Sequence, residues 1–490
     1  MLDKIKNLSK DTMIYGTSTI VGRFLNFLLV PVYTNIFLPG EFGIVANVYA
    51  YIAILNVFFS VGLESGYFKF ASTVEVGTEK ENFSHPFFGI FLNSLILSAI
   101  LFIFANQFTY LFQIDLNRAY LLRYTAVILF FDALVLVPFG YLRLKHKPRQ
   151  FAMIRIINIS VNVILNLVLI LGFRLGIESV FISNLVASAL TFAMLSPIVI
   201  KNITFTFNKA LVKEILKFSL PYIPAGISAN IIQVINRPIL TALTNESTVG
   251  IFQANYRLGI FMMLFVSMFE FAWRPFFLQN AKEKNAKDIY SKVMTLFILV
   301  ASLIFLFLSF FIDNIAQMKL PFKGYLIGKA YWGGLNIVPV ILLGYLFYGI
   351  YINLMAGIYI KKKTKYLPYI TGIAAAINVI VNFALIPRIN MMASAIATLI
   401  SYIAMVIGIY IVSQKYYYIQ YEFKKIILMF ISLGISYVFY FVTLNLYDHW
   451  ILKLISLIIF IVLIFIFKIF NFNTVKNLLS PFKKYWSKKE

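Results

Sequence analysis

Long hydrophobic stretches separated by short polar segments run along the whole chain. Most stretches are about 20 residues or longer, the length that a helix needs to cross a hydrocarbon core of about 30 Å. Strands of a membrane β-barrel would instead be about 10 residues long with alternating polarity, and this pattern does not occur here. We therefore predict an all-α integral membrane protein with fourteen transmembrane helices. The predicted spans are 12–36, 43–69, 86–112, 119–142, 150–172, 176–200, 215–243, 249–277, 290–312, 332–360, 364–386, 390–412, 424–446 and 451–469.

The charged residues in the turns between these spans predict which side each turn faces. Alternate turns and the two termini together carry thirty lysines and arginines, whereas the intervening turns carry eight. Because cytoplasmic loops are enriched in Lys and Arg, both termini are predicted to be cytoplasmic, which requires an even number of spans. The same rule accounts for the net charge of +24, so we expect no nucleic-acid partner.

The composition excludes several classes of protein. Of the 490 residues, 61% are hydrophobic and only 13% are charged, about half the charged share of a soluble domain. Cysteine is absent, and His85, His146 and His449 fall in separate predicted loops, so no metal site is expected. No phosphate-binding Gly-x-x-x-x-Gly-Lys-Ser/Thr loop is present, which argues against an ATP-driven pump. We expect a non-enzymatic transporter without a cofactor, driven by a proton or sodium gradient or by the membrane potential.

Two sequence matches indicate an internal repeat. The residues Pro31, Thr34, Gly43 and Tyr49 recur 207 positions later as Pro238, Thr241, Gly250 and Tyr256. Likewise, Asn162-Val-Ile-Leu-Asn166 recurs 216 positions later as Asn378-Val-Ile-Val-Asn382. Because an even number of spans is repeated, both halves should have the same orientation, as in transporters with two lobes around a central site. The prediction is an N-terminal lobe (1–200), a C-terminal lobe (201–412) and a region with two further spans and a basic tail (413–490).

Eight ionisable side chains in the predicted spans are the candidates for charges within the membrane. They comprise five arginines and three acids: Arg23, Arg155, Arg237, Arg257, Arg274, Glu64, Asp132 and Glu270. A buried arginine costs about 2.5–3.5 kcal/mol on insertion scales, so such residues usually face a cavity or each other. Even complete pairing leaves two positive charges, which an anionic substrate would offset.

Polar residues also line one face of span 1 and one face of span 7. The helical spacing joins Thr12, Gly16, Thr19, Arg23 and Asn26 in span 1, and Ser219, Tyr222, Gly226, Asn230, Gln233 and Arg237 in span 7. We predict that these faces line a water-filled cleft between the lobes. Hydrogen bonding between packed helices is the alternative interpretation.

Five of the ionisable residues are candidates for gating or ion coupling. Glu270 and Arg274 are spaced to form an ion pair on one helix. Asp132 lies in the middle of span 4 and could carry a proton or pair with Arg123 or Arg155. Glu64 lies near the cytoplasmic end of span 2, where it could cap a cytoplasmic gate or simply meet the membrane interface. Prolines in the spans are expected to kink their helices: Pro31, Pro138, Pro221, Pro224 and Pro238.

Several segments in this order resemble the polysaccharide and oligosaccharide flippases of the multidrug/oligosaccharidyl-lipid/polysaccharide exporter superfamily. They are 16–23, 31–35 with 41–43, 142–152, 218–224, 236–237 with 249–252, and Trp273-Arg274-Pro275-Phe276. Where many members of the family have Asp-Arg, this chain has Asn236-Arg237. If that aspartate couples ions in the family, coupling through this position is in doubt here.

The resemblance implies a function and a substrate. It implies alternating access by two lobes that moves a sugar repeat unit, carried on undecaprenyl diphosphate, across a bacterial cytoplasmic membrane. Arg23 and Arg257 are then expected to contact the diphosphate, with Arg237, Asn26, Asn230 and Gln233 nearby. Polysaccharide polymerase or chain-length proteins would be the partners, and the products would be O-antigen, lipopolysaccharide or capsule.

Two other functions remain open from sequence. A cation-coupled multidrug exporter of the same superfamily would prefer acidic residues in its cavity, and the excess of arginine argues against it. A membrane polymerase or glycosyltransferase acting on lipid-linked sugars often carries a large outward loop or a soluble catalytic element. The longest predicted outward loop, 313–331, is short.

Overall fold

The computed structural model describes residues 16, 20–321, 324–444 and 450–469. Within these residues the chain is helical apart from a two-stranded hairpin. The first half contains α2 (Leu29–Ile36), α3 (Pro39–Ser60), α4 (Leu63–Thr73), α5 (Glu79–Ile103), α6 (Ala105–Phe112), η1 (Leu116–Arg118), α7 (Ala119–Leu134), α8 (Leu136–Leu144), α9 (Pro148–Leu167), η2 (Val168–Gly172) and α10 (Glu178–Asn202). The second half contains α11 (Lys209–Ser219), α12 (Tyr222–Val234), α13 (Asn236–Leu243), α14 (Glu246–Tyr256), η3 (Arg257–Gly259), α15 (Ile260–Gln279), α16 (Ala286–Ala316), β1 (Lys319–Leu320), β2 (Gly324–Tyr325), η4 (Lys329–Ile337), α17 (Val338–Ile360), η5 (Thr364–Tyr366), α18 (Leu367–Ile389) and α19 (Met391–Tyr416). Two further helices follow, α20 (Phe423–Leu444) and α21 (Trp450–Ile466).

The lengths and hydropathy of these helices agree with an all-α membrane protein. Twelve helical segments of the described chain are long and apolar enough to cross a membrane, and two shorter apolar helices cover Ile20–Ile36 and Trp450–Ile466. These fourteen segments overlap the fourteen predicted spans. Most of the beginning of span 1, including Thr12 and Thr19, lies outside the described residues, as does His449.

Most of the predicted proline kinks coincide with helix breaks. A helix is interrupted at Leu28, Val135 and Ile235, in each case three residues before a proline. The reason is that proline cannot donate a backbone hydrogen bond and its ring clashes with the preceding turn. The break at Leu28 and the break at Ile235 are 207 residues apart, which is the offset of the sequence repeat. A fourth break, at Leu220 and Pro221, separates α11 from α12.

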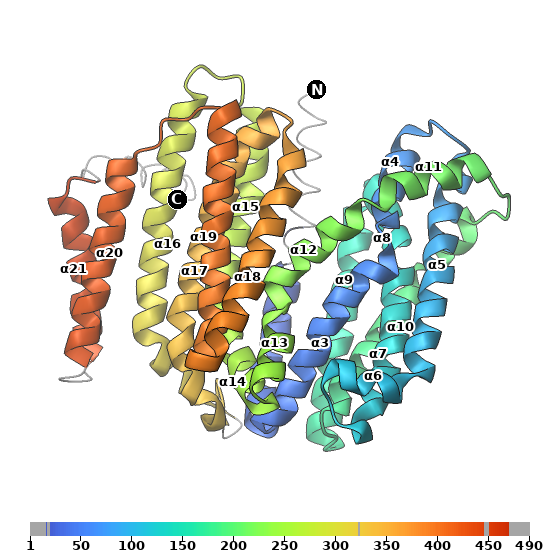
Figure 1. The fold of residues 1–490 in the computed structure, drawn as a ribbon, viewed down its shortest axis with the longest axis horizontal. Coiled ribbons are helices and arrows are strands. Elements are labelled where there is room, and N and C mark those ends of the chain that lie inside the picture. Colours follow the sequence, from blue (N-terminus) through green and yellow to red (C-terminus); the bar gives the residue numbers. More distant parts are fainter. Residues whose placement is uncertain (1–15, 17–19, 322–323, 445–449, 470–490) are drawn as a thin grey trace, which may run out of the picture.

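The helices form two bundles that meet at one end of the molecule. In Figure 1, α5, α7, α9 and α10 lie on one side and α15–α19 on the other, with α12 running between them and α20 and α21 at the far edge. The two bundles approach each other where α3 and α14 begin. We call this end the crossing end.

At the crossing end the backbones of α3 and α14 touch. A methyl group at Gly43 would overlap the carbonyl oxygen of Glu246, and one at Gly250 would overlap the carbonyl oxygen of Pro39. Glycine is required at both positions because only a residue without a Cβ atom permits this approach. The two contacts are reciprocal and related by the offset of 207.

The first helix of each half also packs on the second helix of the other half. In span 1, Arg23 donates a hydrogen bond to Ser267 of α15 at 2.8 Å, and the Phe27 ring packs on Phe261 with centroids 5.3 Å apart. In span 7, Gly226 of α12 lies against Val57 of α3. Each first helix is therefore placed between its own bundle and the opposite one.

Equivalent asparagines on α9 and α18 hold spans 1 and 7 to their own bundles. The Tyr33 hydroxyl donates to Asn166 on α9 at 2.8 Å. The Asn382 amide on α18 donates to Asn236 of α13 at 2.9 Å. Asn166 and Asn382 are the last residues of the two repeated Asn-x-x-x-Asn segments, so the repeat performs the same structural role in both halves.

A short β-hairpin at the crossing end forms hydrogen bonds with the end of span 1. The sequence pattern did not predict this hairpin. Strands β1 and β2 are antiparallel, and the Asn35 side chain both donates to the Tyr325 carbonyl at 2.6 Å and accepts from the Tyr325 amide at 3.0 Å. The Gly328 amide donates to the Thr34 hydroxyl at 3.1 Å, and the Tyr331 hydroxyl donates to the Phe37 carbonyl at 2.9 Å. The hairpin and η4 thus tie the second half to the end of span 1.

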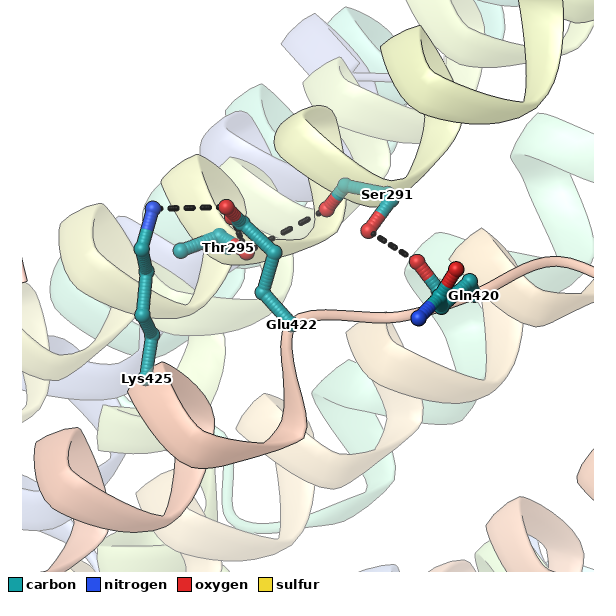
Figure 2. A network of polar contacts seen from close by, with 5 residues as sticks. All are labelled: Ser291, Thr295, Gln420, Glu422 and Lys425. Atoms are coloured by element: carbon teal, nitrogen blue, oxygen red, sulfur yellow. Dashed lines mark hydrogen bonds and ion pairs between the residues drawn. The ribbon is translucent and has the colours of Figure 1, made fainter.

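A polar network attaches the segment before α20 to α16 (Figure 2). Thr295 donates to one carboxylate oxygen of Glu422 at 2.7 Å, and Lys425 donates to the other at 2.6 Å. Nearby, Ser291 donates to the Gln420 carbonyl at 2.8 Å. Partial burial tends to raise the pKa of Glu422, but its bonds to Lys425 and Thr295 and the nearby charge of Lys292 lower that pKa overall.

We expect Glu422→Gln to loosen this attachment. The lowered pKa means that the ionised carboxylate stabilises the folded state above its usual pKa of about 4.3, and that this contribution is lost as the pH falls through the folded-state value. For a half-exposed pair it amounts to about 1 kcal/mol. Amide hydrogen exchange at residues 420–426 should be about fivefold faster in the variant at pH 7, and the difference should shrink below pH 4. Glu214→Gln is the control, and equal exchange at pH 7 would contradict the prediction.

Candidate functional site

Near the crossing end a cavity of about 360 Å³ lies between the two halves. We call it the cationic cavity, because its wall contains two arginines, Arg237 and Arg257, and no acidic residue among those described. Its other polar lining residues are Asn26, Tyr33, Tyr49, Asn158, Asn162, Asn184 and Gln253. A cavity with two cations and no acid in its wall is suited to an anion.

Neutral groups hold both arginines in place. Arg237 is 7% exposed and donates through Nε to the Gln253 side chain at 2.9 Å. Its guanidinium lies 4.6 Å from the centre of the Tyr256 ring, a favourable cation–π distance. Arg257 donates to the backbone carbonyl of Asn26 at 3.4 Å. Neither arginine forms an ion pair with a residue that the structure describes, so both retain charge for a ligand.

A second cavity, of about 440 Å³, lies further from the crossing end. We call it the polar cavity. Its charged lining residues are Glu64, Asp132 and Arg155, and Asn56, Ser60, Ser188, Thr191 and Asn230 add amides and hydroxyls. Asn158 and Asn184 belong to the walls of both cavities, so the two spaces adjoin.

A third cavity, of about 250 Å³, lies between span 1 and α15. We call it the lateral cavity. It is lined by Arg23, Ser267, Glu270 and Arg274, together with apolar residues. The predicted ion pair between Glu270 and Arg274 is present. Arg23 therefore lies in this lateral cavity and not with Arg257, although both arginines are on the seam between spans 1 and 8.

The structure separates the predicted polar faces into distinct environments. Asn26 lines the cationic cavity and Asn230 lines the polar cavity. Gln233 lines none of the three cavities, and its backbone carbonyl accepts a hydrogen bond from Arg237. Ser219 is fully buried against Gly66, and Gly16 packs on Phe271. Part of each face therefore lines a cavity, and part packs between helices.

The other charged candidates have specific partners. Glu64 forms an ion pair with Arg143, and the Arg143 guanidinium stacks 4.6 Å from the Phe68 ring centre. Asp132 accepts a hydrogen bond from Ser188 at 2.6 Å. It forms no ion pair with Arg123 or Arg155, the two partners predicted for it, and Arg123 instead donates to Asn106 at 3.4 Å.

Apart from Arg155, sequence reasoning did not assign to a cleft the residues that α9 and α10 contribute to the cavities. Arg155, Asn158 and Asn162 follow one another at helical spacing on α9, and Asn184, Ser188 and Thr191 do the same on α10. This spacing is visible in the sequence and could have revealed a third and a fourth polar face.

Asn236 lies in a cluster of uncharged side chains. Its amide donates to the Thr398 hydroxyl at 2.8 Å, and its oxygen accepts from Asn382 at 2.9 Å, while Ser394 donates to Asn382 at 2.8 Å. Within the described ranges, no group of three or more His, Cys, Asp or Glu residues could hold a metal ion. At Asn236 the chain thus holds its helices together with neutral hydrogen bonds.

Comparison with known protein families gives the identity of the chain. A family profile described as "Polysaccharide biosynthesis protein" matches residues 8–281, which is more than half of the sequence. The chain belongs to this family. No curated protein sequence matches it significantly.

Solved structures with the same fold are transporters. The structure entitled "Lipid II flippase MurJ, inward closed conformation" matches with a TM-score of 0.71 and 20% identity, over 93% of this chain and 98% of that one. An inward-facing MATE multidrug transporter of the MOP superfamily matches with a TM-score of 0.64 and 12% identity, over 80% and 94%. The Vibrio cholerae MATE transporter VcmN, as a D35N mutant, matches with a TM-score of 0.58 and 12% identity, over 84% and 96%. This member of the polysaccharide biosynthesis family is therefore a multi-pass membrane protein with the fold of these transporters.

Proposed function

We propose that this protein is a transporter, a flippase for oligosaccharide repeat units linked to undecaprenyl diphosphate. It moves them from the cytoplasmic to the outer leaflet of a bacterial cytoplasmic membrane, for assembly into O-antigen, lipopolysaccharide or capsule by a polymerase. The observation that carries the proposal is the cationic cavity, in which Arg237 and Arg257 face a shared space with no acidic residue in its described wall. A diphosphate provides the charge that this cavity lacks.

The proposed topology has fourteen spans with both termini in the cytoplasm. In this orientation the crossing end lies at the outer face, where Gly43, Gly250 and the hairpin close the cationic cavity from outside. Rocking of residues 1–200 against 201–412 would open that end and close the opposite one. The isoprenoid tail would stay in the lipid throughout.

Arg23 and Arg257 would act in succession on the diphosphate. Both lie on the seam between spans 1 and 8, Arg23 in the lateral cavity and Arg257 in the cationic cavity. Arg274 is the second cation in the wall of the lateral cavity. We infer that the diphosphate meets Arg23 on its way to Arg257, which keeps a positive charge beside it along the path.

Proteoliposomes test this function directly. Vesicles with undecaprenyl diphosphate–N-acetylglucosamine in one leaflet should show the protein transferring the lipid to the other leaflet, chemically unchanged. A lengthened or cleaved glycan would instead indicate a polymerase or glycosyltransferase. Transport of ethidium without movement of the lipid would indicate a multidrug exporter.

A further inference from the structure

The polar cavity contains charged groups that the binding of a diphosphate does not use. Asp132 accepts a hydrogen bond from Ser188 through Oδ1. Arg155 stacks on Phe139, with its guanidinium 4.5 Å from the ring centre. Neither side chain forms an ion pair with any residue in the described ranges. A charge kept in a membrane without an ionic partner is costly, and it usually marks a place where a polar ligand binds.

The balance of charge in this cavity disfavours an anion. Two carboxylates, Glu64 and Asp132, face it together with the single guanidinium of Arg155. Glu64 is already neutralised by Arg143, which leaves one negative and one positive group. The cationic cavity, by contrast, has two arginines and no described acid in its wall. The phosphates therefore belong in the cationic cavity, and an uncharged ligand suits the polar cavity.

The remaining side chains in the wall match the surface of a sugar. A sugar hydroxyl both donates and accepts hydrogen bonds, so it can serve Asp132, which accepts, and Arg155, which donates, at the same time. Phe139, Val135 and Leu136 provide apolar surface for the C–H face of a pyranose ring. The volume of about 440 Å³ falls in the range typical of small-molecule sites.

The junction between the two cavities places this site next to the phosphates. Asn184 donates to the Tyr49 hydroxyl at 3.0 Å, and Asn158 donates to Thr191 at 2.7 Å. The amide oxygens of both asparagines accept no hydrogen bond from the described part of the chain. They are therefore available at the point where a glycosidic link would join a sugar to the diphosphate.

We propose that the polar cavity is a glycan subsite, in which Asp132 and Arg155 bind hydroxyl groups of an uncharged sugar attached to the diphosphate. This inference rests on the proposed function. It assigns the diphosphate and the sugar to two different sets of side chains, so the two sets can be tested separately.

The test compares two lipids on the purified full-length protein in detergent. One lipid is undecaprenyl diphosphate, and the other is undecaprenyl diphosphate–N-acetylglucosamine. The wild type should bind the glycosylated lipid about tenfold more tightly than the bare one. Asp132→Asn should remove this preference while its affinity for the bare lipid stays within twofold, which also shows that the variant is folded. Arg257→Ala should weaken the binding of both lipids.

Asp115→Asn, a change at an exposed residue outside the cavities, is the control and should behave as the wild type. Equal affinity of the wild type for the two lipids would overturn the glycan subsite and leave the flippase function standing. So would an Asp132→Asn variant that retains the preference or weakens the binding of both lipids alike. Failure of the wild type to bind either lipid would overturn the proposed function itself.

Discussion

Arg257→Ala is expected to reduce the flipping rate in proteoliposomes at least 100-fold. The guanidinium faces the cationic cavity, and the one hydrogen bond that it forms with the described residues, to the Asn26 carbonyl, is long at 3.4 Å. A charge-assisted contact with phosphate contributes about 1.5–3 kcal/mol, and two such contacts are lost together. Arg257→Lys keeps the charge but not the planar pair of donors, so we expect about a tenfold reduction.

Arg388→Ala provides the matched control for this variant. Arg388 is an exposed arginine near the end of α18, outside all three cavities, and its loss should change the flipping rate less than twofold. Immunoblotting of membranes would establish that all variants reach the bilayer in equal amounts.

Arg23→Ala should also reduce flipping, since Arg23 precedes Arg257 on the proposed path. Normal flipping by both Arg23→Ala and Arg257→Ala would refute the role of the arginines.

Gly43→Ala is expected to force the crossing end apart. The added methyl group would overlap the Glu246 carbonyl, and since this obstacle is backbone, no rotamer change can relieve it. The strain should reach or exceed the roughly 1–3 kcal/mol typical of an overpacked site. We expect the closed arrangement of α3 and α14 to be lost and flipping to fall at least tenfold.

Labelling of an introduced cysteine measures this opening. The chain has no cysteine of its own, and Val249 is fully buried at the crossing. A Val249→Cys reporter should react with a membrane-impermeant maleimide at least tenfold faster when Gly43→Ala is present. Gly40→Ala is the matched control, because a methyl there would meet only the Ser247 hydroxyl at 3.3 Å. Unchanged labelling with normal flipping would rule out a closing role for Gly43.

Much of the fold follows from the sequence because the membrane imposes helix length and backbone pairing. The hydrophobic runs predict where the helices lie. The sequence offset of 207 residues relates the two halves, including their helix breaks at Leu28 and Ile235. The break at Val61 and Gly62, where both residues have positive φ, was not predicted, and a tertiary contact accompanies it. Gly62 lies against the Ser219 carbonyl, and this contact between residues about 160 positions apart has no signal in the local sequence.

The candidate site was harder to predict than the fold. Helical spacing identifies the polar face of span 1, but not which neighbour each residue on that face meets. Arg23 and Asn26 share this face, yet Arg23 contacts Ser267 in the lateral cavity while Asn26 lines the cationic cavity. Asp132 accepts a hydrogen bond from Ser188 on α10 and forms no ion pair with any arginine that the structure describes. This partner could not be predicted, because a hydroxyl group carries no charge by which the sequence would reveal the pairing.

The exchange of first helices between the halves bears on the ancestry of the chain. Span 1 packs on α15 and span 7 packs on α3, so either half alone would expose the surface on which the other half's first helix rests. A single six-helix ancestor could cover that surface only as a pair of identical subunits, each with its first helix laid across its partner. With an even number of helices, gene duplication and fusion would join two such subunits without inverting either in the membrane. Two copies of one gene product, already assembled in this way, are thus the starting point that this architecture favours.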